Sequence, residues 1–572
     1  MKKFLSILLA SIMILCTITA CTSKTEGNGD ESSKDTVISV DSDDNISLDG
    51  TLPIIKDPSK FPKMTMLLIS GPTRVVPAAE MLQVQRLTKE TGVEFDWQEI
   101  PSEGSGEKIN LMLASNNVPD AFWNGITNEM IVQYMDQDIF IPTEELTQKY
   151  MKSLTSIYEK RPEYKSGATA PNGHRYGFPY IEEMFGLVLT PGPFYINKVW
   201  LDKVGKSVPT TVDEYVDCLK AFRDTPDLNG NGEQDEIPYS LYFAAKDVFG
   251  SYNTFHQFTA CFGKMTTYSG LPQDFMTVED DKIVFTAKDP AFKETARFFN
   301  MLNNEKLIDP DSFSPGTNNI PLFLNDLKGD EALIGSFGLW SITGEIPNIS
   351  LREQYVPLPR LQGPEGKMGH KLNFSEMQNA GQVVITSACE YPEVIAAYVD
   401  YIFDPEMSIT TNWGAIGYVY NKGEDGMLHF DLDENNNIIL KDGFKTFDDL
   451  RTNSTPARGA MAILNEYYGT IADYTWDAAP IIEAQRVNGK EDILEEYTSI
   501  PRMLLTVEEQ SKVSQIQPQI FNIVTKYTME WVLDGNIDET WDKYINELEN
   551  AGLKDLLGTF QGAYDRYLSN ME

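Results

Sequence analysis

The first folded part of the chain alternates between short apolar runs and amphipathic segments. Residues 64–69 (MTMLLI) form an apolar run between proline and glycine, which is typical of a buried strand. Residues 78–91 have helical spacing and end at a glycine, and residues 93–97 alternate as a strand does. A helical segment at 108–114 then precedes a third short strand. This order of strands and helices predicts an α/β unit with a parallel sheet.

The pattern continues to the end of the chain and indicates a second folded part. Residues 211–222, 290–303 and 392–402 are amphipathic, and residues 332–335 read as a buried strand. Residues 507–568 are dominated by helical patterns. The fold class that we predict is therefore α/β, with two α/β lobes joined by hinge segments and a helix-rich C-terminal part. The carboxyl ends of the parallel strands should face a ligand cleft.

The N-terminus predicts the compartment. Two lysines precede an apolar run at 4–15, which is shorter than the ~20 residues of a membrane span. The run ends in Ile18-Thr19-Ala20-Cys21, which resembles the lipobox of bacterial lipoproteins. We expect cleavage after residue 20, acylation of Cys21 with lipid such as palmitate, and a flexible acidic tether at 21–60. A plain secretory signal with an incidental cysteine is the alternative.

Composition excludes some partners. The 572 residues include 85 acidic and 47 basic side chains, a formal charge of −38. Such a chain lacks the basic face that nucleic acid or an anionic bilayer surface requires. Cys218, Cys261 and Cys389 are too widely spaced for a zinc site and are expected to be buried thiols, with at most one disulfide.

One loop carries a strong chemical motif. Residues 227–236 (DLNGNGEQDE) alternate oxygen-bearing side chains around two glycines, an arrangement that suits the oxygen ligands of Ca²⁺. The twelfth position of an EF-hand supplies a bidentate carboxylate, but Pro238 stands there in this chain. Asp235 and Glu236, earlier in the loop, must therefore provide that contact. The alternative is an Asx-rich turn that binds no ion. We predict a structural calcium ion whose ligands are Asp227, Asn229, Asn231, the Glu233 carbonyl, Asp235 and Glu236.

Several stretches match one family in order along nearly the whole mature chain. They are 172–179 (NGHRYGFP), 200–205 (WLDKVG), 208–211 (VPTT), 227–238, 307–310 (LIDP), 361–367 (LQGPEGK), 412–417 (NWGAIG) and 563–568 (AYDRYL). Together they resemble the extracellular solute-binding lipoproteins of carbohydrate ABC importers, in the LplA-like branch that includes alginate-binding proteins. The resemblance implies a periplasmic-binding-protein fold that closes on a sugar, and calcium in the same loop.

Sugar contacts should come from aromatic side chains with polar neighbours, because sugars present both apolar faces and hydroxyl edges. Core packing is the alternative for each of these rings. Tyr474 and Trp476 form a further aromatic pair in the sequence. The candidates are Trp123, Asn124, Tyr180, Trp340, Trp413 and Trp476.

The predicted function is a monomeric protein, lipid-anchored on the outer face of the bacterial membrane, that delivers an oligosaccharide to ABC permease subunits. No catalytic residues are predicted, since no HExxH, GxSxG or triad spacing is present. The alternative is a secreted glycoside hydrolase or another carbohydrate-active enzyme, whose carboxylates need no fixed spacing. The expected division of the chain is 1–20 signal peptide, 21–60 tether, 61–177 and 351–415 N-lobe, and 178–350 and 416–572 C-lobe.

Overall fold

The computed structural model describes residues 44–241, 255–313, 326, 327, 329–434, 438–474 and 478–571. The predicted signal peptide, Cys21 and Trp476 lie outside these described residues. Two large hydrophobic cores organise the described chain, and we call them the first core and the second core.

The first core is built on a six-stranded mixed sheet with strand order β13-β4-β10-β3-β1-β2. Strand β1 pairs in parallel with β2 and β3, which confirms the parallel unit predicted from the N-terminal pattern. Strand β10 is antiparallel to both β3 and β4, and β13 is parallel to β4. The strands are β1 (Met64–Ser70), β2 (Phe95–Pro101), β3 (Ala121–Phe122), β4 (Phe178–Glu182), β10 (Met377–Ile385) and β13 (Met461–Ile463).

Helices with one buried face cover this sheet, as amphipathic spacing requires. The first of them, α1, ends at Gly92, which has φ +70° and packs against the backbone of Ile55. The helices are α1 (Leu82–Thr91), α2 (Ser105–Ala114), α3 (Asn128–Tyr134), α4 (Glu144–Tyr150), α5 (Lys152–Lys160), α6 (Pro162–Ala168), α13 (Pro392–Ile402), α14 (Pro405–Trp413) and α15 (Phe447–Ser454). A small hairpin, β11 (Tyr420–Lys422) and β12 (Leu428–Phe430), belongs to the same core.

The second core contains an antiparallel sheet of order β8-β5-β9 and a hairpin of β6 and β7. These strands are β5 (Phe194–Asn197), β6 (Met276–Glu279), β7 (Lys282–Phe285), β8 (Ser336–Gly338) and β9 (Tyr355–Pro357). The helices packed with them are α7 (Lys198–Lys203), α8 (Val212–Asp224), α9 (Pro290–Asn304), α11 (Ile342–Glu345), α12 (Ile349–Arg352), α16 (Ala478–Val487), α17 (Lys490–Glu496), α18 (Val507–Asp534), α19 (Ile537–Asn550) and α20 (Leu553–Ser569).

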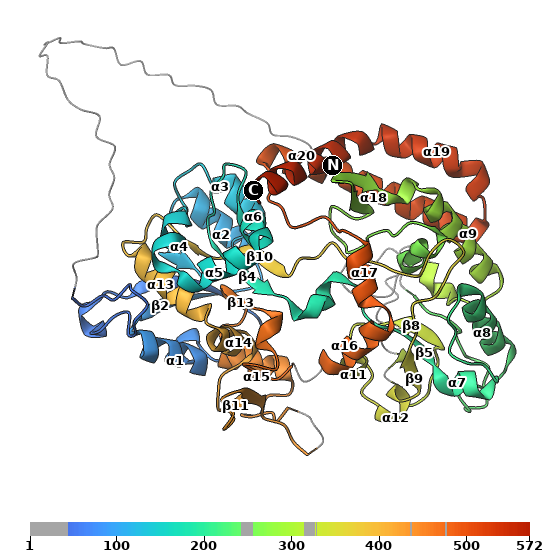
Figure 1. The fold of residues 1–572 in the computed structure, drawn as a ribbon, viewed down its shortest axis with the longest axis horizontal. Coiled ribbons are helices and arrows are strands. Elements are labelled where there is room, and N and C mark those ends of the chain that lie inside the picture. Colours follow the sequence, from blue (N-terminus) through green and yellow to red (C-terminus); the bar gives the residue numbers. More distant parts are fainter. Residues whose placement is uncertain are drawn as a thin grey trace, which may run out of the picture. The chain divides into compact units, whose positions relative to one another are not determined.

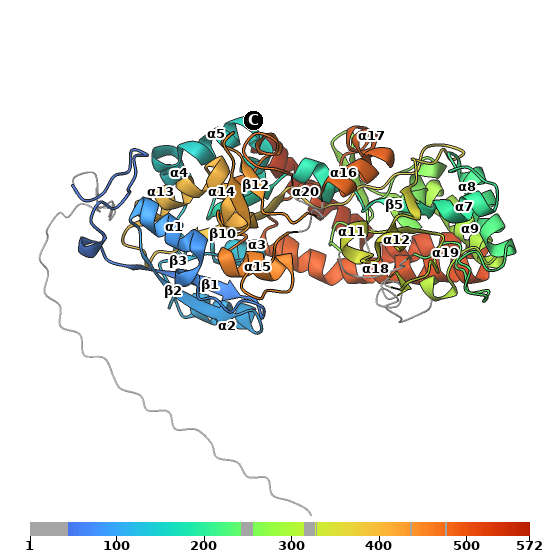
Figure 2. The ribbon, with the colours of Figure 1, turned by 90° about the horizontal axis from the view of Figure 1, so that it is seen from below.

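The last three helices confirm the predicted helix-rich C-terminal part (Figure 1). Helix α18 begins with a capping box, in which Thr506 and Glu509 each bond to the other's backbone N–H. Helices α18 and α20 contact each other, and they also contact α3 and α6 of the first core (Figure 2). The C-terminal helices therefore connect the two cores.

Among the described residues, the chain passes between the cores at 182–193, at 369–376 and at 473, 474 and 478–483, and we call these the crossing segments. Further along, Leu504 again belongs to the first core. The expected lobe division stays a prediction, and the cores themselves are assigned by burial. Buried residues between 355 and 368 belong to the second core, and those between 419 and 472 belong to the first. Strand β13 joins the first core because it pairs with β4, almost 300 positions earlier in the sequence, a contact that local patterns do not reveal.

Candidate functional site

The first two crossing segments run side by side. The Glu182 N–H donates to the Glu376 carbonyl at 2.8 Å, and the Leu372 N–H donates to the Leu189 carbonyl at 2.8 Å. Between these bonds the first segment bends sharply, because Met184 and Phe185 have φ of +43° and +55°. Residues other than glycine rarely adopt such angles, so the surrounding contacts must hold the bend in place. The junction between the cores is thus a defined structure.

Aromatic rings gather at this bend. The ring of Phe185 lies 5.6 Å from that of Tyr468 and 5.3 Å from that of Tyr474, measured between centroids. Tyr468 and Tyr474 stack on each other at 5.9 Å. Tyr468 is buried, whereas 46% of Tyr474 is exposed. We call Phe185, Tyr468 and Tyr474 the aromatic group, and its exposed ring offers a surface on which a sugar could stack.

A second apolar cluster follows directly on the same crossing segment. Leu187, Ala478 and Ile481 are buried together, and half-buried Trp340 packs against them. Trp340 follows β8, so the second core contributes it. Among the predicted ligand rings that the structure describes, Trp340 and Trp413 are half-buried, and Trp340 is the one that packs against this cluster.

Two predicted contacts belong to the interior instead. Trp123 has no exposed surface, and its indole N–H donates to the Pro456 carbonyl at 3.0 Å. Gly459 lies so close to the indole that an added Cβ would come within 2.2 Å of it. Tyr180 is also buried, with its hydroxyl bonded to the Glu182 carboxylate. In this arrangement, neither ring has a face open to a sugar.

The Glu182 carboxylate is the centre of a buried polar network. Asn412 donates to it at 3.0 Å, and Arg451 donates to the Asn412 side-chain oxygen at 2.6 Å. Burial raises the pKa of Glu182, although the nearby Arg451 guanidinium opposes this shift. The guanidinium also lies 4.4 Å from the ring of Trp413, which stacks on Phe447. Trp413 therefore helps to hold this network in place.

The remaining predicted contact, Asn124, follows the carboxyl end of β3. Its side-chain oxygen accepts from the Ile69 N–H at 2.8 Å, so it fastens β3 to the end of β1. The residue is half-buried.

Sequence reasoning missed a cavity of about 180 Å³ that residues of both cores line. Asn128 of α3, Asn373 of a crossing segment and Arg502 each bring a buried polar atom without a hydrogen-bond partner among the described residues. Burial lowers the pKa of Arg502, because a charged guanidinium is costly to desolvate. Such unpaired atoms call for water or a polar ligand. These three residues are scattered along the sequence, so no local pattern could have indicated the cavity.

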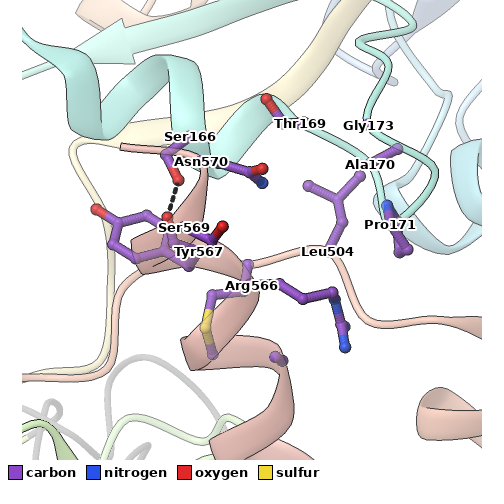
Figure 3. Close-up of a pocket in the computed structure, with 12 residues that line it drawn as sticks. Ser166, Thr169, Ala170, Pro171, Gly173, Leu504, Arg566, Tyr567, Ser569 and Asn570 are labelled. Carbon is purple, nitrogen blue, oxygen red and sulfur yellow. Dashed lines mark hydrogen bonds between the residues drawn. The ribbon is translucent and has the colours of Figure 1, made fainter. Parts of the chain in front are cut away.

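Another cavity, of about 230 Å³, lies between α6 and α20 (Figure 3). Ser166 donates to the Tyr567 carbonyl at 2.6 Å, as the dashed line shows. Arg566 is paired with Glu509 at 2.7 Å. Since its main polar groups already have protein partners, this cavity joins two helices and makes little demand for a ligand.

The loop at 227–236 is held together by its own side chains. The Asp227 carboxylate accepts from the Gly232 N–H at 2.8 Å, and the Asn229 oxygen accepts from the Asn231 N–H at 3.1 Å. Both asparagine amide nitrogens donate to Asp235, at 3.0 and 3.1 Å. The amide hydrogens therefore lie between the amide nitrogens and the Asp235 carboxylate oxygens. A bound cation would supply positive charge to the same carboxylate.

The structure adds a residue that the loop sequence could not reveal. The Glu331 carboxylate accepts from the Asn231 amide at 3.1 Å, although the two residues are 100 positions apart. It thereby supplies a carboxylate to a loop in which Pro238 stands at the twelfth position. Within the described part of the chain, no group of three or more His, Cys, Asp or Glu side chains is arranged to hold a metal ion. Any ion at this loop would therefore depend on asparagine and backbone oxygens too.

Cys218, Cys261 and Cys389 are buried free thiols, which confirms the expectation for them. None of the described helices is long and apolar enough to cross a membrane.

Comparison with known proteins identifies the class. Residues 83–420 match the family model described as bacterial extracellular solute-binding protein. The chain is 33% identical over 529 residues to the fructooligosaccharide ABC transporter substrate-binding protein FusA of Streptococcus pneumoniae, covering 89% of this chain and 91% of that protein. The chain belongs to the family of bacterial extracellular solute-binding proteins, and the resemblance seen in the sequence is confirmed.

Solved structures of solute-binding proteins have a fold similar to that of this chain. An S. pneumoniae FusA EF-hand mutant in complex with fructo-nystose has a TM-score of 0.69 and 30% identity, covering 89% of this chain and 100% of that one. A solute-binding protein from Bifidobacterium longum infantis, described as HMO-binding, has a TM-score of 0.74 at 22% identity, covering 89% and 99%. The predicted two-lobed solute-binding fold is therefore confirmed. These relatives are transport proteins that bind their substrates.

Proposed function

We propose that this protein captures an oligosaccharide outside the cell and delivers it to an ABC importer. The observation that carries the proposal is the 33% identity, over nearly the whole chain, to a fructooligosaccharide-binding protein. Short fructooligosaccharides such as kestose and nystose are the first ligands to test. The ligand would lie at the junction of the cores, where a neutral sugar needs exposed rings and unpaired polar groups.

The proposed contacts follow from exposure and hydrogen bonding. Tyr474 and Trp340 offer partly exposed rings beside the first crossing segment. Asn128, Asn373 and Arg502 offer unpaired polar atoms in the cavity shared by both cores. Asn124 adds a polar group at the end of β3. Trp123 and Tyr180 are proposed to support the site from the interior, and half-buried Trp413 is proposed to support it through its contact with Arg451.

Calorimetric titration of the purified protein with kestose and nystose, with sucrose for comparison, tests the proposal. We expect saturable binding of at least one oligosaccharide and no change in its chain length by chromatography. Turnover of the sugar would instead favour the carbohydrate-active enzyme. Absence of binding to a broad glycan panel would contradict the proposal.

We propose a lipid anchor at Cys21, on the basis of the lipobox-like sequence before it. Metabolic labelling with a palmitate analogue should modify the wild-type protein and place it in the membrane fraction. Cys21→Ala should remain unlabelled and be released into the medium. Equal labelling of both would contradict the assignment.

We propose a structural calcium ion in the 227–236 loop, held by Asp227, Asn229, Asn231, the Glu233 carbonyl, Asp235 and Glu236, with Glu331 beside them. Support comes from the oxygen-rich residue set, which suits a hard cation, and from the EF-hand named in the FusA mutant. An asparagine amide that now donates to Asp235 would present its oxygen to the ion after a half-turn. Calcium there would neutralise part of the local negative charge.

A further inference from the structure

Two carboxyl groups on neighbouring crossing segments share one hydroxyl group. The Tyr164 hydroxyl of α6 lies 3.2 Å from a Glu183 oxygen and 3.1 Å from a Glu376 oxygen. Glu183 belongs to the first crossing segment and Glu376 to the second. Because a phenol carries a single proton, Tyr164 cannot donate to both carboxylates at once. Burial raises the pKa of the Tyr164 phenol, so this proton stays on the ring.

The two carboxyl groups differ in their other partners. Glu183 is buried and accepts from Arg161 and from the Asn465 N–H at 2.8 Å, so its negative charge is well stabilised. For the Glu376 carboxyl, the described residues provide the Tyr164 hydroxyl as hydrogen-bond partner. Glu376 is thus the group on which an additional proton would relieve the repulsion between the two carboxylates.

The surroundings of Glu376 are well defined. Burial and the charge of Glu183 raise the pKa of Glu376 to about 7, against the opposing influence of Arg161. The buried ammonium groups of Lys371 and Lys490 also interact electrostatically with Glu376. Each of them donates a hydrogen bond to a backbone carbonyl. The charged and titratable groups that face Glu376 are Glu183, Tyr164, Glu163, Arg161, Lys371 and Lys490.

We propose that Glu376, Tyr164 and Glu183 form a proton-binding site between the crossing segments, so that movement of these segments during ligand binding takes up or releases a proton. The part concerning ligand rests on the proposed function. The physical reason is that the separation of the two carboxylates sets their repulsion, and the crossing segments carry one each. Any rearrangement of the junction changes this separation and hence the proton affinity of Glu376.

The existence of the proton site is tested without sugar, by thermal melting of the full chain between pH 5 and 8.5. In the unfolded chain Glu376 would titrate near its ordinary value of 4.5. Between that value and about 7 the folded state binds more protons, so Glu376 should make stability fall as pH rises. Glu376→Gln should lack this part of the decline. Tyr164→Phe removes the shared hydroxyl and should extend the decline to higher pH.

Glu466→Gln is the matched control, because exposed Glu466 pairs with the same Arg161 but does not contact Glu376. It should decline with pH as the wild type does. If the wild type and Glu376→Gln have parallel curves, the proton site is refuted. If Glu376→Gln does not fold, the Tyr164→Phe curve decides in its place.

The coupling is tested by titration calorimetry with kestose near pH 7, in buffers of different ionisation enthalpy. A dependence of the measured heat on the buffer, abolished in Glu376→Gln, is the expected result. Kd should change about tenfold over the titration range for each unit by which the pKa of Glu376 differs between free and bound protein. Buffer-independent heat in the wild type would refute the coupling.

The two hypotheses fail in different ways. If no sugar binds at any pH while the stability curves differ as expected, the proposed function fails and the proton site stands. If sugar binds with buffer-independent heat, the proposed function stands and the coupling fails.

Discussion

Tyr474 is the residue whose surroundings best suit direct contact with a sugar. Its ring stacks on Tyr468 and packs on Phe185, yet almost half of the side chain is exposed. A ring that its neighbours already hold in place loses little conformational entropy when a ligand stacks on it. The phenol side chain combines an apolar ring face with a polar hydroxyl group. This combination suits the mixed surface of a sugar.

Replacing Tyr474 with alanine should weaken oligosaccharide binding. Loss of one stacking surface costs about 1–2 kcal/mol, which corresponds to a roughly 5–30-fold higher Kd in calorimetry. Tyr474→Phe should keep most of the affinity, because it keeps the ring. Leu111→Ala, an exposed apolar residue on α2, is the control and should bind normally. An unchanged Kd for Tyr474→Ala would remove this ring from the site.

Gly92 shows how one residue decides an element boundary. Its φ of +70° ends α1, and an added Cβ would lie 1.9 Å from the Ile55 carbonyl oxygen. We expect Gly92→Ala to lower the free energy of unfolding by about 2–4 kcal/mol, because backbone cannot move aside as a side chain can.

Gly205 provides a matched control for this substitution. It has φ +69°, but an added Cβ there would meet nothing within 4 Å. Gly205→Ala should therefore cost only the left-handed backbone strain of about 1–2 kcal/mol. Urea unfolding measures both variants, and equal losses would show that the contact with Ile55 is unimportant.

At the scale of elements, the 227–236 loop connects the end of α8 to a backbone bridge between Ile237 and Ile334. The loop therefore anchors α8 to the strand region that precedes β8. Glu331 reaches the loop from that same region. An ion held between the loop and Glu331 would stabilise both segments. Such an ion would have a structural role, and the loop is distant in sequence from the aromatic group.

Calcium removal should lower the melting temperature and leave sugar specificity unchanged. A site with a Kd of ~10⁻⁴ M in ~1 mM calcium contributes about 1.4 kcal/mol, which corresponds to a fall of about 1–3 °C on chelation. Glu331→Gln and Asp235→Ala should melt at the lower temperature and respond less to EDTA.

Glu233→Gln is the control for this experiment, since only the Glu233 carbonyl is a proposed ligand and its side chain is exposed. It should respond to EDTA as the wild type does. A melting curve of the wild type that EDTA does not move would assign the loop to an Asx-rich turn. Loss of sugar binding on chelation, with the fold intact, would place the ion in the ligand site.

At the scale of the whole molecule, specific contacts among the described residues join the two cores. Backbone hydrogen bonds join the first two crossing segments, and α18 and α20 contact helices of the first core. Because the crossing segments of the described chain link two separately packed cores, the junction is the natural place for movement while each core stays packed. A ligand bound at the junction would contact both cores and restrain this movement.

Hydrogen exchange should reveal such a restraint. Saturating oligosaccharide should slow amide exchange in residues 182–193 and 369–376, because a ligand between the cores stabilises the segments that link them. Exchange in α8, whose buried residues belong to the second core, should change little. Uniform protection of the whole chain, or none, would contradict closure at these segments.

The sequence by itself determined the local features whose causes are local. Helical spacing predicted α8, α9 and α13 within one or two residues at each end, because the buried face of a helix repeats every three to four positions. The parallel strands at the start of the first core and the helix-rich end followed from the same kind of pattern. The motifs in their order along the chain also sufficed for the family, since a long set of weak matches is specific as a whole.

Only the tertiary structure decided which distant residues meet. Pairing of β13 with β4 assigned residues 419–472 to the first core, and Glu331 came to the loop from 100 positions away. Long-range packing also placed Trp123 and Tyr180 in the interior. The aromatic group likewise joins one crossing segment to residues nearly 300 positions later. The physical reason is that exposure and contact depend on long-range packing, which leaves no periodic trace in the local order of hydrophobic and polar residues.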